Sequence, residues 1–152
     1  MINIPRTYYE WKQVFEILES GENDGEVLEA IYNGTVYWQS GVAERFNNRL
    51  IKTINKRMDK ASDKMQKGLK RATSEGDIVN LCLAMRKEFE FLYKVINMNA
   101  LPEDYKESYR DMIDNSVSTL QNSLEESAKK DRTGKLLTII KNNRVDNVDR
   151  GC

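Results

Sequence analysis

The most informative absence in this 152-residue chain is histidine, which does not occur at all. Histidine is the commonest general base and metal ligand in proteins. Every catalytic triad that needs an imidazole is therefore excluded. We expect no cofactor, no metal site and no catalytic residues, and we interpret the protein as non-enzymatic.

Cysteine and proline are also scarce, with two residues of each. Cys82 falls in an apolar stretch and is typical of a small buried hydrophobe, and Cys152 ends a polar tail. Two such positions do not form a disulfide framework, which favours a reducing compartment. The amino terminus has no apolar stretch typical of a signal peptide, and the apolar patch 78–85 is too short to span a bilayer. We therefore expect a cytoplasmic protein that does not associate with membranes.

Strand signals are missing, because no segment alternates apolar and polar residues between hairpin turns. Helix signals are abundant. The spacing of apolar residues predicts an all-α, single-domain helical bundle with three long amphipathic helices over about 36–72, 75–97 and 103–128. Short helices are predicted at both ends. The domain is expected to cover 1–141, followed by a polar, disordered tail over 142–152.

The longest predicted helix carries an apolar seam whose members recur at alternating spacings of three and four. This helix is longer than the two it would pack against, so part of the seam is expected to need a second copy as cover. We therefore predict a homodimer. The predicted self-association seam consists of Ile51, Ile54, Met58, Ala61, Met65 and Leu69.

Charge is unevenly distributed, although the net charge is zero. Residues 1–44 contain two basic and eight acidic side chains, a balance of −6, whereas residues 45–71 contain ten basic and two acidic, a balance of +8. At 100° per residue, seven of the basic residues share one face of the long helix. This basic stripe consists of Arg45, Arg49, Lys52, Lys56, Lys60, Lys67 and Lys70.

Three uses of the basic stripe stay open: contact with an acidic protein surface or a second copy, contact with nucleic-acid phosphates, and simple solubility. Asp59 and Asp63 dilute the stripe, and no aromatic residues alternate with its bases to stack on unpaired nucleotides. The acidic amino-terminal region is itself a candidate partner. We therefore rank another protein or the chain itself ahead of nucleic acid.

Two acidic pairs, Glu26 with Glu29 and Asp111 with Asp114, each place two carboxylates on one helix face. Metal-dependent nucleotide hydrolases built from helices use such pairs, but they need a second pair nearby, and Glu44 stands alone. This function ranks third. The best interpretation is a helical interaction or regulatory module, with a composition typical of small bacterial or phage proteins.

Overall fold

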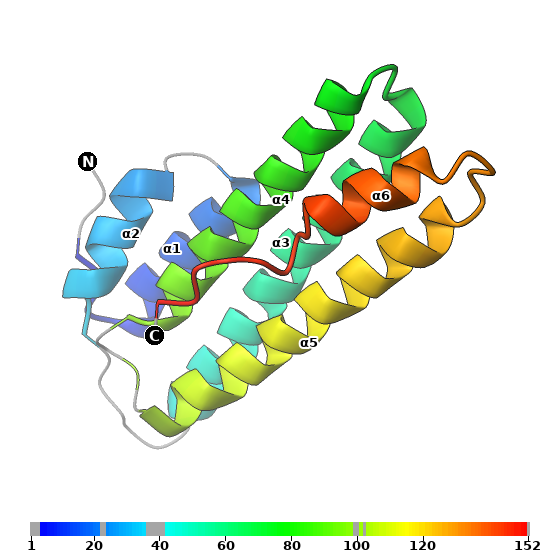
Figure 1. Cartoon of the computed structure of the whole chain (residues 1–152). Helices are drawn as coiled ribbons and strands as arrows, with labels where there is room; N and C mark the ends of the chain where they lie inside the picture. Colours follow the sequence, from blue (N-terminus) through cyan, green and yellow to red (C-terminus); the bar gives the residue numbers. More distant parts are fainter. Residues whose placement is uncertain (1–3, 22–23, 36–41, 99–100, 102, 152) are drawn as a thin grey trace. The chain divides into compact units, whose positions relative to one another are not determined.

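The computed structural model describes residues 4–21, 24–35, 42–98, 101 and 103–151. These residues form six helices and no strand, which confirms the predicted all-α helical bundle (Figure 1). The helices are α1 (Tyr8–Ser20), α2 (Asp24–Asn33), α3 (Val42–Arg71), α4 (Glu75–Ile96), α5 (Glu103–Ala128) and α6 (Lys135–Asn142). The three long predicted helices correspond to α3, α4 and α5. The first six residues of the predicted range 36–72 lie outside the described residues.

Helix ends follow from local capping chemistry. The Thr7 hydroxyl accepts a hydrogen bond from the Glu10 backbone N–H at 3.3 Å and begins α1, and Gly21 ends it with φ +80°. The Ser74 hydroxyl accepts from the Asp77 N–H at 3.2 Å. The Asp77 carboxylate accepts from the Thr73 N–H at 3.0 Å, which begins α4 as a reciprocal cap. These starts and stops were readable in the sequence.

The chain divides into two compact units, each made of segments that are distant in the sequence. Unit 1 contains residues 1–58 and 94–110, and unit 2 contains 59–93 and 111–152. A single domain over 1–141 stays a prediction.

The core of unit 1 is built on aromatic rings. Trp11 and Phe15 of α1 pack against Phe46 of α3, with ring centroids 5.1 and 5.3 Å from that of Phe46 in edge-to-face geometry. The Trp11 indole N–H donates to the Thr35 carbonyl at 2.8 Å. A side chain at Gly34 would overlap the Trp11 ring, so the absence of a Cβ allows the end of α2 to approach α1.

The core of unit 2 is mainly aliphatic and comes from the three long helices, α6 and the segment that follows α6. The apolar residues of unit 2 with at most 1% exposure are Met65, Cys82, Leu92, Tyr93, Ile113, Val117, Ala128, Ile140 and Val145. Gly68 of α3 lies directly against the side chain of Leu81 of α4, so this leucine occupies space that a side chain on α3 would need.

The polar carboxyl-terminal segment has defined contacts in the structure, where the sequence predicts disorder. Val145 is 0% exposed, and Arg150 bonds to Asp114 of α5. A polar segment with two valines has too little periodicity to reveal such contacts, because they depend on the helix faces it meets.

Candidate protein-interaction surface

Part of the basic stripe contacts α1 of the same chain. In unit 1, Glu19 of α1 forms ion pairs with Arg49 at 3.2 Å and with Lys56 at 3.5 Å. Glu19 also accepts a hydrogen bond from the Thr53 hydroxyl at 3.0 Å. The side chains of Glu19 and Arg49 are each only 15% exposed, so this carboxylate is enclosed by α3.

Arg45 also contacts α1, because its guanidinium lies 4.8 Å from the centre of the Tyr8 ring. Lys52 is exposed. The amino-terminal half of the stripe therefore already receives an acidic and an aromatic residue from the neighbouring helix. It is not a uniform row of solvent-exposed charges.

Arg57, which the stripe did not include, is the most buried cation of this half, with 7% exposure. It donates to the Leu18 carbonyl at 2.8 Å, in the last turn of α1. Carbonyls in that turn have no partner within their own helix, so Arg57 supplies one. The sequence contains no signal for this contact, because it depends on which carbonyl lies opposite residue 57.

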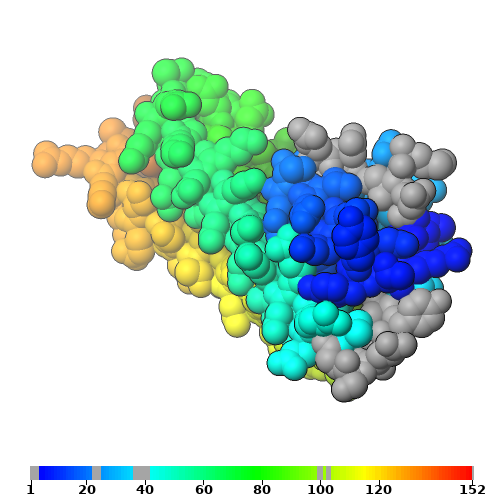
Figure 2. Space-filling model, turned by 180° about the vertical axis from the view of Figure 1, so that it is seen from behind, coloured from blue at the N-terminus to red at the C-terminus, as the bar shows by residue number. Residues whose placement is uncertain are grey.

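The second half of α3, in unit 2, carries five cations that are exposed. Lys60, Lys67 and Lys70 of the predicted stripe are exposed, and so are Lys64 and Arg71, which the prediction missed. Figure 2 shows this part of α3, coloured teal to green, at the molecular surface. At 100° per residue, Lys60, Lys64, Lys67 and Arg71 lie within about 60° of one another, and we call these four residues the basic face. Their spacing of four, three and four was the signal that could have identified them.

The basic face is short. Its four cations extend over roughly 16 Å at 1.5 Å per residue. One turn of duplex DNA is about 34 Å long, so the face spans about half a turn and reaches few phosphates. This size suits a small acidic surface on a protein better than a nucleic-acid backbone.

The predicted self-association seam is largely buried inside the single chain. Met65 is 0% exposed, Ile54 is 1%, Ala61 is 6% and Met58 is 8%. Ile51 and Leu69 are half-buried. Seam residues that are covered by their own chain offer little apolar surface to a second copy. Dimer formation through the seam stays a prediction.

The two acidic pairs differ in their surroundings. Glu26, Glu29 and Asp111 are exposed, whereas Asp114 bonds to Tyr93 and Arg150. Within the described ranges, no group of three cysteine, aspartate or glutamate side chains is placed to hold a metal ion. Burial raises the pKa of the Cys82 thiol, which keeps this sulfur protonated and a poor nucleophile.

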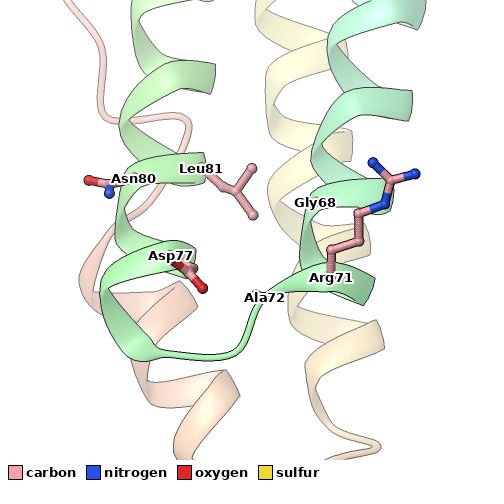
Figure 3. Close-up of a pocket in the computed structure, with 6 residues that line it drawn as sticks. All are labelled: Gly68, Arg71, Ala72, Asp77, Asn80 and Leu81. Atoms are coloured by element: carbon pink, nitrogen blue, oxygen red, sulfur yellow. The ribbon is translucent and has the colours of Figure 1, made fainter.

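A pocket of about 340 Å³ lies at the turn between α3 and α4. Gly68, Leu81 and Asp77 line it together with Arg71, Ala72 and Asn80. Figure 3 shows Leu81 and Asp77 directed toward α3, whereas Arg71 and Asn80 point away from each other. The Asp77 carboxylate already accepts from the backbone N–H and the hydroxyl of Thr73. The polar groups of this pocket therefore do not converge on one ligand position.

Comparison with known proteins gives the chain no family. It matches no model of a known protein family, no characterised protein and no solved structure. The helices that the structure describes include none with the length and apolar character of a membrane span. Function must therefore be argued from the charged surfaces of this chain alone.

Proposed function

We propose that this protein is a non-enzymatic helical interaction module that binds an acidic protein surface through the basic face of α3, and that a second copy supplies this surface. The observation that carries the proposal is the way Glu19 is held by Arg49 and Lys56. In unit 1, α3 already accepts a carboxylate from an amino-terminal helix. The basic face carries exposed cations of the same chemical kind.

The acidic amino-terminal helices offer a matching surface. Glu16 of α1 and Glu29 of α2 are exposed. Contact between these carboxylates on one copy and the basic face on another would neutralise the two regions of opposite charge. Such complementarity favours association without a large apolar interface.

Neutralising the basic face tests the proposal. We expect the triple variant Lys60→Gln, Lys64→Gln and Lys67→Gln to weaken self-association about two- to thirtyfold, because the two surface ion pairs that Glu16 and Glu29 can form contribute roughly 0.2–1 kcal/mol each. The measurement is light scattering over a concentration series at low ionic strength. Glutamine is nearly as good a helix former as lysine, so the fold should persist.

A matched control removes three exposed lysines elsewhere: Lys87→Gln, Lys94→Gln and Lys141→Gln. This variant has the same net charge and should associate like the wild type. Glu16→Gln with Glu29→Gln should weaken association as the basic-face variant does. A constant mass near 17.7 kDa at every concentration would contradict self-association.

Nucleic-acid binding is the competing function, and the same variants decide it. Four cations that neutralise four phosphates predict a slope of about −3.6 for log affinity against log salt. We expect negligible affinity for a duplex at about 150 mM salt, measured by fluorescence anisotropy. Submicromolar binding at that salt concentration, lost in the triple variant, would reverse our ranking of the two partners.

A further inference from the structure

The carboxyl-terminal segment 143–151, which we call the tail, contacts α4 and α5 without forming a helix or a strand. Figure 1 shows it as the red trace that follows α6. The residues that receive it are Glu90 and Tyr93 of α4 and Asp114, Gln121 and Glu125 of α5, which we call the tail-binding face. All of these residues belong to unit 2.

The tail has an apolar anchor at Val145, whose side chain is 0% exposed. The backbone N–H of Val145 donates to the Gln121 side-chain oxygen at 2.9 Å. Gln121 is also 0% exposed, and its amide nitrogen lies 3.5 Å from the Ile140 carbonyl. A buried glutamine on α5 is thus used to satisfy the backbone of an irregular segment.

The tail has a charged anchor at Arg150, five residues further on. Its Nε donates to Asp114 at 3.1 Å and to the Tyr93 hydroxyl at 3.3 Å, and Tyr93 itself donates to Asp114. The guanidinium also lies 5.8 Å from the centre of the Tyr93 ring. A hydrogen-bonded pair of side chains on two helices therefore receives one arginine.

The tail-binding face carries three carboxylates, those of Glu90, Asp114 and Glu125. Asp114 receives Arg150 directly, whereas Arg144 bonds to Asp146 of the tail itself at 2.9 Å and lies 3.8 Å from Glu125. The Asp149 N–H donates to Glu90 at 3.4 Å. A peptide-recognition surface has the same parts: a site for an apolar residue, a side chain that bonds the peptide backbone, and acidic residues that bind arginine.

We propose that the tail-binding face is a docking surface for an extended segment of a partner protein, and that the tail occupies it as an internal competing ligand. The partner segment has a branched apolar residue followed five positions later by an arginine. This proposal is independent of the basic face of α3 and of self-association.

The tail sets the affinity of the surface. A segment attached by a short connection has an effective concentration in the millimolar range. The apparent affinity for a partner is therefore its intrinsic affinity multiplied by the fraction of molecules whose tail is released. Releasing the tail should expose the surface fully.

The experiment uses the full chain with its tail released by Val145→Asp and Arg150→Ala. The probe is a fluorescently labelled synthetic peptide with the sequence of residues 142–151. We expect this variant to bind the peptide at least about tenfold more tightly than the wild type, whose own tail competes. A peptide carrying the same two substitutions should not bind either protein.

Circular dichroism first establishes that the double variant is folded. A folded double variant that does not bind the peptide would overturn the proposal and leave the tail a purely structural segment. If the double variant does not fold, Arg150→Ala alone is used, because the Arg150 side chain is 40% exposed and its loss disturbs the core less. Arg150→Ala should also bind the peptide more tightly than the wild type, and no gain would refute the proposal. A stable complex of wild type with the double variant, formed without peptide, would assign the surface to a second copy instead.

Discussion

At the scale of single residues, the polar side chains inside unit 2 link its helices to the tail. Tyr93 illustrates this, since it is 0% exposed yet bonds both Asp114 and Arg150. Burial is the main reason that the pKa of Tyr93 is raised to about 12, and the hydrogen bond to Asp114 is the second. An unfolded tyrosine has a pKa of about 10. Neutral Tyr93 therefore contributes stability that is complete below about pH 10 and is lost as the pH rises through about 12.

Replacing Tyr93 by phenylalanine removes this pH dependence. Between pH 9 and pH 11 we expect the wild type to lose about 1 kcal/mol more unfolding free energy than Tyr93→Phe, measured by urea denaturation. Burial also raises the pKa of Tyr109, but this contribution is the same in both proteins and cancels. Tyr9→Phe, at a tyrosine that is 68% exposed, is the matched control and should keep the wild-type pH dependence. Equal losses in the wild type and Tyr93→Phe would show that the Tyr93 hydroxyl ionises as easily when folded as when unfolded.

At the scale of helices, the contact between α3 and α4 depends on the missing side chain of Gly68. A Cβ there would overlap the Leu81 side chain. We expect this overpacking to cost about 1–3 kcal/mol, whereas alanine gains about 1 kcal/mol in helix propensity. Gly68→Ala should therefore lower the unfolding free energy by up to about 2 kcal/mol in urea denaturation.

Gly76→Ala is the control, because its Cβ would meet only Ser74 at 3.8 Å, and it should stabilise the protein by about 0.4–1 kcal/mol. A Gly68→Ala protein as stable as Gly76→Ala would mean that the Leu81 side chain moves aside at little cost.

The helices were predictable where their signals are local. Thr73, Ser74 and Asp77 cap α4 by bonding to one another, so five residues of sequence contain the information that fixes its start. Gly21 likewise ends α1 through its own backbone. The apolar character of the self-association seam was predictable too, because its residues recur at helical spacing within one segment of sequence.

Contacts between distant segments were not predictable. The pairing of Arg57 with the Leu18 carbonyl, and of Arg150 with Asp114, joins residues more than thirty positions apart. Periodicity indicates which side of a helix is polar, but not what lies opposite it. The candidate surface was predicted as a stripe of seven cations with the acidic amino-terminal region among its possible partners, but periodicity did not indicate that Glu19 is the residue that contacts Arg49 and Lys56.

At the scale of the whole molecule, zero net charge coexists with an acidic amino-terminal region and a basic segment in α3. The long-range field is therefore weak, and only close approach brings opposite charges together. The Debye length falls from about 10 Å at 0.1 M salt to about 3 Å at 1 M. Association through the basic face should consequently weaken as salt is added. An interface formed by the apolar seam would not weaken, because added salt does not screen apolar contacts.

The salt dependence of the oligomeric state therefore separates the two dimer interfaces. We expect the dissociation constant to rise about two- to thirtyfold between 50 mM and 1 M NaCl, the range expected for the basic-face variant, since the same surface ion pairs are screened. Sedimentation velocity at both salt concentrations measures this change, and the basic-face variant should show a much smaller one. A dimer that persists at 1 M NaCl would point to the seam as the interface.

The variant Met65→Asp tests whether the seam is an interface or part of the core. If Met65 lies in a dimer interface, the variant should stay folded and become monomeric. Because Met65 is 0% exposed within its own chain, we expect the variant to unfold instead, which circular dichroism measures.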